Sequence, residues 1–391
     1  MRILYSHRTR STDGQFVHID ALTHAMHGLG HELLICGPEG VHGFGQRSST
    51  MTDAGFDTSV RRRTTPTMPP AAKELAELSY NGWAAQRLLR AAVRFKPDII
   101  YERYNLFFHA GAWVARAMNL PRLLEVNAPL AVERAQHGSL TLKGMARWSE
   151  GRLWRHADAV LPVSKVLGEH LISAGVAPDR VHIVPNGVDE DVLTPVHAHP
   201  IRAQYGLTDH LVLGFVGFVR EWHGVDRVLH WMATDDGYAA RLLIVGDGPA
   251  VPGLKVLANR LGVADRLVIT GVVERSAVPG HIAAFDIALQ PAATDYASPL
   301  KLQEYMAQSR SILAPRQANI MEALTHDKTA WLFHPEADDQ FAMGLSYLAQ
   351  NAEVRDRLGA AARTYLLERD LTWTANARRV TQLAEALVNR R

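Results

Sequence analysis

Short apolar runs alternate with longer amphipathic stretches along most of the chain, and the alternation occurs as two successive series. Each run has the length of one buried strand, and the stretches between the runs have the apolar spacing of helices. Strands that alternate with helices form parallel sheets, because each parallel connection needs a crossover. The pattern therefore predicts an α/β protein with two doubly wound, Rossmann-like sheets. The first series comprises 2–7, 32–36, 98–102, 122–126, 158–163 and 181–185, and the second comprises 211–217, 241–246, 266–271, 286–291, 311–315 and 330–333.

The length of the chain and one polar segment divide these two series into domains. A chain of 391 residues exceeds the size of one ordinary hydrophobic core. Residues at about 190–205 are rich in Pro, Gly, Asp and His, and we expect a linker there. We therefore expect an N-terminal domain at 1–195 and a C-terminal domain at 205–371, with a cleft between them. The helical pattern at 372–391 is expected to pack against either domain, including back across the first.

One interval, 38–71, breaks the rhythm of strands and helices and contains the triplet Arg61-Arg62-Arg63. Long loops of this kind are usually functional or disordered.

The basic segment 139–158 contains Trp148 and Trp154 and has two interpretations. It is either a helix on a membrane surface or, more commonly, a helix with one solvated face.

Composition excludes several classes of protein. A formal net charge of +2 is too small to indicate a nucleic-acid-binding protein. The single cysteine, Cys36, excludes an internal disulfide and a cysteine-based zinc site, and the histidines show no zinc-protease spacing. No apolar run reaches the roughly 20 residues of a membrane span. We therefore expect a cytoplasmic protein, with a loose peripheral membrane contact left open.

The segment 298–307 combines a helix start with a charge of the wrong sign. Ser298 and Pro299 are typical of an N-cap and a first helical residue. Lys301 then lies in the first turn, where the helix dipole disfavours a cation. An anion bound by the Lys301 side chain and by the backbone amides of residues 298–301 explains this placement, with Glu304 one turn deeper to accept hydrogen bonds from sugar hydroxyls. The alternative is an intrahelical Lys301–Glu304 pair worth only ~0.3 kcal/mol.

Two glycine-containing loops follow strands of the second series. After Gly217 come Arg220 and His223, and a basic residue at the carboxyl end of a strand can hold a phosphate. Gly246 belongs to "VGDGPA", in which a helix is expected to start at Pro249. This turn has two equally supported interpretations, a ligand-contacting loop or a plain strand-to-helix turn.

The first domain offers a smaller set of candidates at 8–16. Ser11 and Thr12 supply hydroxyl groups, and Gly14 supplies a flexible turn, next to a phosphate or an acceptor hydroxyl. Asp13 is equally well interpreted as a simple helix N-cap.

Seven segments, taken in order and spacing, resemble the retaining glycosyltransferases of family 4 (glycosyl transferases group 1), which have the GT-B fold. The resemblance extends over nearly the full chain. It implies transfer of a sugar from a UDP or GDP sugar to a glycan, glycolipid or small-molecule acceptor, in bacterial-type polysaccharide, glycolipid or glycoconjugate synthesis. It further implies no essential metal or other cofactor, and the small net charge already led us to expect no nucleic-acid partner. The segments are 158–171, 181–189, 215–229, 242–249, 286–292, 298–307 and 319–324.

The resemblance also implies roles for particular residues. The C-terminal domain would bind the nucleotide and the N-terminal domain most of the acceptor. The diphosphate would bind to Arg220 and to the start of the helix, which comprises Ser298, Pro299, Leu300 and Lys301. His223 stands where the family usually has a lysine. Glu304 would bind the ribose, and the backbone at Gly271, Val272 and Val273 would meet the base.

Two positions depart from the family's pattern. Tyr296 stands where the family often has a first glutamate, and the neighbouring Asp295 is the candidate for a contact with the donor sugar. Asn127, which like Glu125 is a polar candidate at the end of a strand in the first domain, stands in place of a histidine. Retaining transferases of this kind are thought to use the leaving phosphate as the base, which is compatible with Asn127. The departures leave two alternatives open: a degenerate protein that binds nucleotide sugar or glycan, and a sugar-nucleotide epimerase of the same fold.

Overall fold

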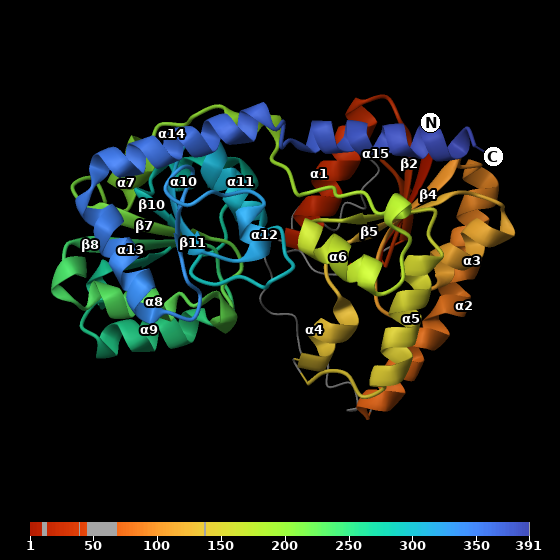
Figure 1. Cartoon of the computed structure of the whole chain (residues 1–391), viewed down its shortest axis with the longest axis horizontal. Helices are drawn as coiled ribbons and strands as arrows, with labels where there is room; N and C mark the ends of the chain where they lie inside the picture. The colour runs from red at the N-terminus through yellow and green to blue at the C-terminus, as the bar shows by residue number, and fades with distance from the viewer. Residues whose placement is uncertain (10–13, 39, 45–68, 137, 391) are drawn as a thin grey trace. The chain divides into compact units, whose positions relative to one another are not determined.

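The computed structural model describes residues 1–9, 14–38, 40–44, 69–136 and 138–390 (Figure 1). The chain forms two compact units, of which the first comprises Met1–Pro185 with Asn376–Arg391 and the second comprises Asn186–Ala375. Each unit contains one six-stranded sheet. Ser11, Thr12 and Asp13 and most of the interval 38–71 lie outside the described residues.

The sheet of unit 1 has the strand order β3-β2-β1-β4-β5-β6. All neighbouring strands are parallel except β2 and β3, which pair antiparallel. Tyr5 pairs in register with Ile35 on one side and Tyr101 on the other. The strands are β1 (Arg2–Ser6), β2 (Glu32–Gly37), β3 (Gly40–Gly43), β4 (Ile99–Arg103), β5 (Arg122–Val126) and β6 (Ala159–Pro162). The helices are α1 (Gly14–Gly28), α2 (Pro70–Phe95), α3 (Ala110–Ala117), α4 (Leu130–Gln136), α5 (Lys143–Arg155), α6 (Lys165–Ser173) and the short η1 (Pro178–Arg180).

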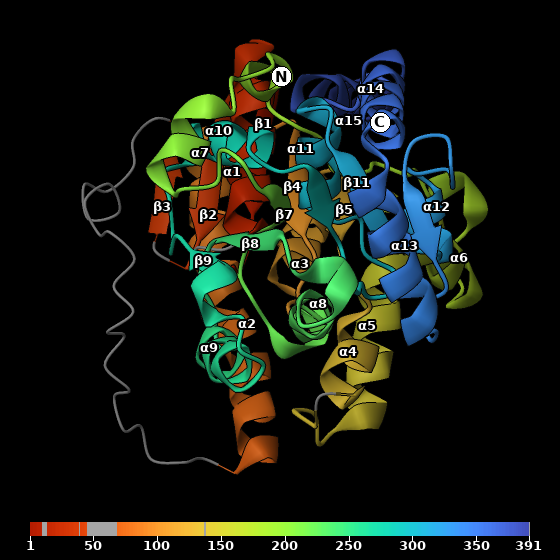
Figure 2. The ribbon, with the colours of Figure 1, turned by 90° about the vertical axis from the view of Figure 1, so that its left-hand side faces the viewer.

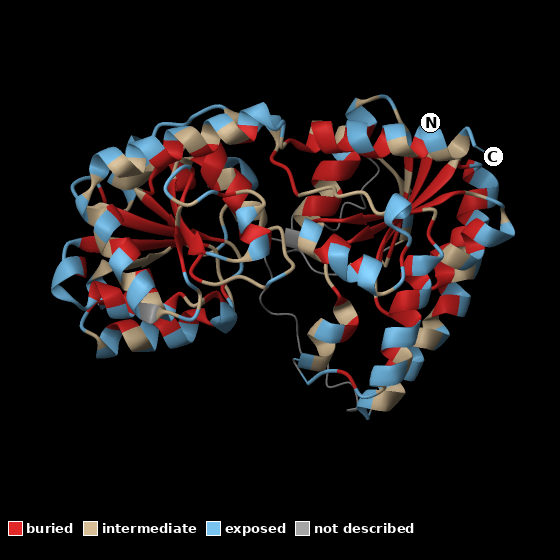
Figure 3. Cartoon of the chain, viewed as in Figure 1, coloured by how far each residue is buried: buried red, intermediate tan, exposed pale blue. Residues whose placement is uncertain are grey.

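The sheet of unit 2 has the order β12-β11-β10-β7-β8-β9 and is parallel throughout. Two apolar clusters cover its two faces, and Figure 3 shows most of its strand residues as buried, whereas the edge strand β9 is only partly buried. The strands are β7 (Leu211–Val216), β8 (Ala240–Val245), β9 (Leu267–Ile269), β10 (Ile287–Leu289), β11 (Ser311–Pro315) and β12 (Trp331–Phe333). The α-helices are α7 (His199–Gln204), α8 (Asp226–Met232), α9 (Val251–Arg260), α10 (Val278–Ala283), α11 (Leu300–Ala307), α12 (Ala318–Met321), α13 (Asp338–Gln350) and α14 (Ala352–Glu368). The short 3-10 turns are η2 (Glu190–Leu193), η3 (Glu221–His223), η4 (Asp235–Gly237), η5 (Ala264–Arg266) and η6 (Arg275–Ala277).

Both sheets reverse their direction of winding at one place. In unit 1 the first strand, β1, lies between β2 and β4, and in unit 2 the first strand, β7, lies between β8 and β10. The connections that follow β1 and β4 in unit 1, and β7 and β10 in unit 2, therefore leave the sheet toward opposite faces. Open α/β sheets bind their ligands at such a switch point.

Three expectations about individual elements differ from the structure. Residues 181–185 are not a strand, because the segment pairs with β6 through a single bridge at Val181 and two further backbone hydrogen bonds, from His182 and Val184. The strand β3 was not anticipated, since four residues with two glycines give no strand pattern. The helix after "VGDGPA" begins at Val251 rather than at Pro249.

The segment 139–158 contains an ordinary packed helix. On α5, Trp154 is only 1% exposed and packs edge-on against Tyr104, so it belongs to the core. Trp148 on the opposite face is 57% exposed. Among the described residues, none of the helices has the length and hydropathy required to span a bilayer.

The C-terminal helix α15 (Trp373–Val388) connects the end of unit 2 to unit 1 (Figures 1 and 2). Its residues from Asn376 onward belong to unit 1. The Asn376 side chain donates a hydrogen bond to the carbonyl of Pro185, and Val380 and Ala384 are buried.

Candidate functional site

Helix α11 begins at the carboxyl edge of the unit 2 sheet, at Leu300, with Pro299 in the N-cap position. The prediction that Ser298 caps this helix is wrong. The Ser298 hydroxyl and carbonyl instead accept hydrogen bonds from the backbone N–H and side-chain amide of Asn186. Because Pro299 has no N–H, the first helical donors at this end are the amides of Leu300 and Lys301.

The buried face of α11 fixes the helix against the switch point. The Tyr305 hydroxyl accepts a hydrogen bond from the Val216 N–H at 3.1 Å and donates one to the Leu289 carbonyl at 3.4 Å. Val216 ends β7 and Leu289 ends β10, the two strands that flank the switch point. Tyr305 therefore holds the start of α11 beside the carboxyl ends of both strands.

Lys301 points from the first turn of α11 toward the loop after β7. Its Nζ lies 3.7 Å from the centroid of the Phe215 ring. A Cβ atom on Gly217 would lie 3.7 Å from the same Nζ, so the lysine packs against this loop. Burial lowers the pKa of Lys301 to about 7, although the nearby Glu304 favours the charged form. Lys301 is thus a partly desolvated cation that a bound anion would stabilise.

Glu304 lies one turn further along α11, partly buried. Burial raises its pKa to about 7, Arg275 and Lys301 act to lower it, and Asp189 acts to raise it. Arg275 itself forms an ion pair with Asp189. The carboxyl group of Glu304 therefore lies beside an ion pair that joins the start of η2 to η6.

The loops after β7 and β8 pack directly on each other through their backbones. A Cβ atom on Gly246 would lie 2.2 Å from the Gly217 carbonyl oxygen, and one on Gly248 would lie 2.2 Å from the Val219 carbonyl oxygen. Val219 donates a hydrogen bond to the Asp247 carbonyl and accepts one from Ala250. The glycines of "VGDGPA" are thus required for contact between two loops, a role that neither interpretation of this turn included.

Arg220 and His223 form the two ends of the short turn η3. The Arg220 N–H donates to Nδ1 of His223 at 3.0 Å. His223 is 7% exposed, and its ring packs against the Trp222 ring with 3.9 Å between the centroids. Burial, with Lys301 and Arg220 nearby, lowers the pKa of His223 to about 3. The imidazole is therefore neutral near pH 7 and shapes the turn, whereas the exposed Arg220 guanidinium lies 5.0 Å from the Phe218 ring centroid.

The loop after β10 is held by a residue to which sequence reasoning gave no role. The Asn319 side chain donates to the carbonyls of Thr294 and Ala297 and is 4% exposed. Asp295 is exposed and Tyr296 is partly buried within the loop that Asn319 fixes. Asn319 lies in the segment 319–324, so the resemblance marked the position without indicating what its side chain does.

Gly271, Val272 and Val273 lie at the far edge of the same surface. Gly271 has φ +70° and forms an isolated bridge with Gly246. Val272 is 43% exposed, and Val273 packs partly against the core. Unit 2 therefore brings together, at the carboxyl ends of its strands, the predicted residues Gly217, Arg220, His223, Gly246, Val272, Val273, Asp295, Tyr296, Ser298, Pro299, Leu300, Lys301 and Glu304.

Asn127 lies in unit 1, within a buried polar cluster after β5. Its side-chain amide donates to Glu125 and forms a hydrogen bond with His18. Glu125 is also ion-paired with Arg103 and accepts a hydrogen bond from Tyr101. Although burial opposes ionisation of Glu125, His18 and Arg103 beside it hold its pKa below the usual value.

Gly14, the remaining predicted residue of unit 1, begins α1. Among the described residues, no group of three or more His, Cys, Asp or Glu side chains has an arrangement that could hold a metal ion.

Comparison with known proteins identifies both halves of the chain. Residues 12–192 match the model of Glycosyltransferase Family 4, and residues 199–365 match that of Glycosyl transferases group 1. The chain belongs to the glycosyltransferases of family 4. The Anabaena protein HepE, crystallised with UDP-glucose, superposes with a TM-score of 0.74 at 15% identity, over 99% of this chain and 100% of HepE. The two α/β sheets therefore form the GT-B fold, as the resemblance implied.

Two curated relatives illustrate the range of the family. Alpha-D-kanosaminyltransferase of Streptomyces kanamyceticus is 24% identical over 64% of this chain and 66% of its own length. A GDP-mannose-dependent phosphatidylinositol monomannoside mannosyltransferase of Mycobacterium tuberculosis is 25% identical over 67% of this chain and 71% of its own length. For two further relatives the match spans only about half of their length, 54% and 49%.

Proposed function

We propose that this glycosyltransferase moves a sugar from a nucleoside-diphosphate sugar to an acceptor hydroxyl, with retention of the anomeric configuration. The observation that carries the proposal is the position of Lys301, a partly desolvated cation in the first turn of α11 at the switch point of unit 2. In this proposal unit 2 binds the donor and unit 1 binds the acceptor.

The diphosphate binds to Lys301, to the exposed Arg220 and to the amides of Leu300 and Lys301. Departure of the nucleoside diphosphate builds negative charge on its phosphates, and these groups stabilise that charge as it develops. The departing phosphate also takes the proton of the acceptor hydroxyl. The positive charges of Arg220 and of protonated Lys301 provide the electrostatic stabilisation without a metal ion.

The remaining residues orient the donor. Glu304 accepts hydrogen bonds from the ribose hydroxyls, and the backbone at 271–273 contacts the base. Asp295 and Tyr296, in the loop fixed by Asn319, contact the transferred sugar. Asn127, held by Glu125 and His18, contacts the donor sugar from unit 1.

The names of the compared proteins include both UDP-glucose and GDP-mannose donors, so the base of the donor is proposed as uracil or guanine. The acceptor is proposed as a glycan, glycolipid or small molecule in bacterial-type polysaccharide, glycolipid or glycoconjugate synthesis. We place the reaction in the cytoplasm. The exposed Trp148 on α5 suits a peripheral contact at the inner membrane face.

The first test is binding of UDP and GDP measured by thermal shift. A ligand at 100 times its Kd stabilises the folded protein by about 2.7 kcal/mol, enough to identify the nucleotide. The variants Lys301→Ala and Arg220→Ala should each lower kcat/KM by about 10²-fold, or ~3 kcal/mol, because each removes charge stabilisation of the leaving group.

The matched control is Lys255→Ala, which removes an exposed cation from α9. Full activity in both site variants would refute the phosphate site. Nucleotide binding without turnover across a panel of donor sugars would instead favour a degenerate binding protein. A product formed without acceptor would favour an epimerase.

A further inference from the structure

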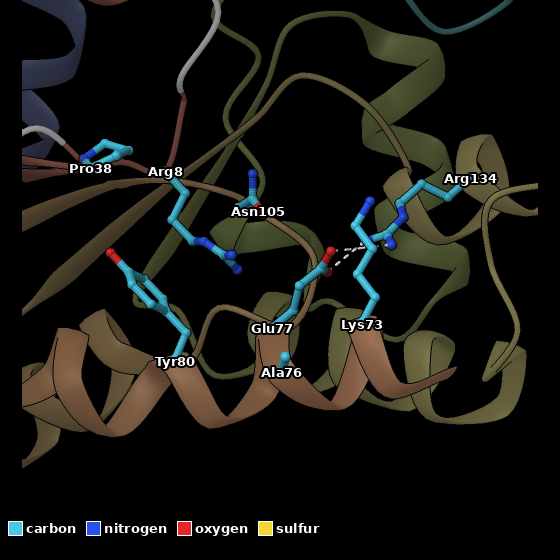
Figure 4. A pocket seen from close by; sticks show the side chains of 8 residues that line it. All are labelled: Arg8, Pro38, Lys73, Ala76, Glu77, Tyr80, Asn105 and Arg134. Atoms are coloured by element: carbon cyan, nitrogen blue, oxygen red, sulfur yellow. Dashed lines mark hydrogen bonds and ion pairs between the residues drawn. The ribbon is translucent and has the colours of Figure 1, made fainter. Parts of the chain in front are cut away.

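A pocket of about 420 Å³ opens at the carboxyl edge of the unit 1 sheet (Figure 4). Arg8 follows β1, Asn105 follows β4 and Pro38 follows β2, so the pocket lies at the switch point of this sheet. Its opposite wall is helix α2, which contributes Lys73, Ala76, Glu77 and Tyr80, and α4 contributes Arg134. This volume is within the range of small-molecule sites and exceeds what one phosphate group fills.

The lining of this pocket is strongly cationic. Arg8, Lys73 and Arg134 supply positive charge, and Glu77 is the one acidic side chain among the described lining residues. The lining thus has two more cationic groups than carboxylates. A phosphate monoester bears about −1.5 to −2 charges near pH 7, which matches this excess.

Contacts within unit 1 hold two of the three cationic groups that line the pocket, those of Arg8 and Arg134. The Arg8 guanidinium lies 4.9 Å from the Tyr80 ring centroid and 5.6 Å from that of Phe108. Arg134 pairs with Glu77, with N–O distances of 2.8 and 3.5 Å, and Figure 4 shows Lys73 beside this pair. A planar guanidinium presents five donors, so pairing with one carboxylate leaves Arg134 able to bind an oxyanion as well.

The wall formed by Tyr80 suits the non-ionic part of the ligand. Its ring is partly exposed and offers an apolar face beside a phenolic hydroxyl, and Asn105 adds an amide that can donate or accept. Such a mixture suits a polyol attached to the phosphate. We propose that this pocket binds a phosphate monoester, and that the acceptor is a phosphorylated sugar or polyol, either free or as a lipid headgroup.

This inference rests on the proposed function only where it calls the ligand an acceptor. Binding of a phosphate monoester to the pocket can be measured without any transferase activity. The probes are glycerol 3-phosphate, glucose 6-phosphate and inositol 1-phosphate, each compared by calorimetry with its unphosphorylated parent. We expect at least one phosphate ester to bind at least about tenfold more tightly than its parent. Vesicles of phosphatidylcholine with and without phosphatidic acid, in a sedimentation assay, test the lipid source of the same group.

Variants distinguish a ligand site from a structural ion pair. Lys73→Gln should weaken binding of the phosphate ester by about tenfold, since a charge-assisted hydrogen bond is lost. The control Arg90→Gln removes a cation from an exposed position of the same helix, outside the pocket, and should leave binding unchanged. Glu77→Gln should tighten binding, because it removes the opposing charge, whereas a purely structural pair predicts lower stability and no gain in affinity.

The result that overturns the inference is equal binding of all esters and parents, together with no preference for vesicles that contain phosphatidic acid. Equal losses in Lys73→Gln and Arg90→Gln would overturn it as well. Titration of UDP and GDP into the same preparation separates the two proposals. Nucleotide binding without ester binding removes this inference alone, and ester binding without nucleotide binding removes the proposed function while the phosphate pocket stands.

Discussion

At the scale of single residues, the decisive feature is the environment of Lys301. Its position in the first turn of a helix could be identified from sequence, and the electrostatic conflict suggested an anion. Its lowered pKa could not be predicted from sequence, because the shift to about 7 arises from burial against the loop after β7, which is remote in sequence. His223 differs: the sequence suggested a phosphate ligand, and the structure adds that its buried ring accepts a hydrogen bond within the turn.

The affinity for a nucleoside diphosphate should fall as the pH rises through about 7. Lys301 has a lowered pKa, so it is charged below about 7 and neutral above it, and only the charged form attracts the diphosphate. The bound anion raises the pKa of the lysine, so protons are taken up on binding near neutral pH. Calorimetric titrations on both sides of pH 7, in buffers of different ionisation enthalpy, measure the affinity and the proton uptake.

Lys301→Met is the control for this pH dependence and should flatten it. Glu304 has a pKa raised to about 7 and becomes a carboxylate as the pH rises. The carboxylate accepts hydrogen bonds from the ribose, so its ionisation raises the nucleotide affinity and partly offsets the loss of charge on Lys301. Glu304→Gln should therefore steepen the fall in affinity. An unchanged pH profile in Lys301→Met would contradict the assignment.

At the scale of elements, the unit 2 site is made by loops that meet only in the folded protein. The loops after β7 and β8 are joined through backbone contacts at Gly217, Gly246 and Gly248. The loop after β10 is held by Asn319 from α12. Each loop could be predicted from its own sequence, but the contacts between loops depend on strand order, which hydrophobic periodicity does not encode.

Gly248→Ala should destabilise the protein by about 1–3 kcal/mol, because the added methyl group would overlap the Val219 carbonyl oxygen and displace the backbone before Arg220. Nucleoside diphosphate affinity should fall with it. The same substitution at Gly253, in the exposed part of α9 with nothing within 4 Å, should stabilise by about 0.5–1 kcal/mol. Chemical denaturation of both variants gives the comparison, and equal effects would show that the loop contact is unimportant.

At the scale of the whole molecule, the chain forms two units with separate cores, and the C-terminal helix α15 takes part in both. Residues 376–391 return to unit 1 after the chain has completed unit 2. The amphipathic pattern of this segment predicted a helix, but its partner had to be left open. The position of the segment at the end of the chain gave no indication of which core it would cover.

Deletion of residues 376–391 should destabilise unit 1 by about 3 kcal/mol or more, since it uncovers apolar surface beneath Val380, Ala377 and Ala384. Amide hydrogen exchange should quicken in the strands of unit 1 and change little in β7 and β8 of unit 2. Deletion of only 389–391 is the control, because these residues follow the helix. Uniform acceleration in both units would show that the helix stabilises the chain as a single cooperative body.

The amino-acid sequence by itself determined the two series of strands and helices, hence two parallel α/β sheets, and it marked the start of α11 as an anion site. These features follow from local periodicity and from the electrostatics of one helix turn. Tertiary structure alone decided that Ser298 pairs with Asn186, that Asn319 fixes the loop after β10, and that Arg8, Lys73 and Arg134 line one pocket. The physical reason is that such contacts join segments far apart in the chain, whose proximity depends on the packing of complete sheets and helices rather than on any local preference.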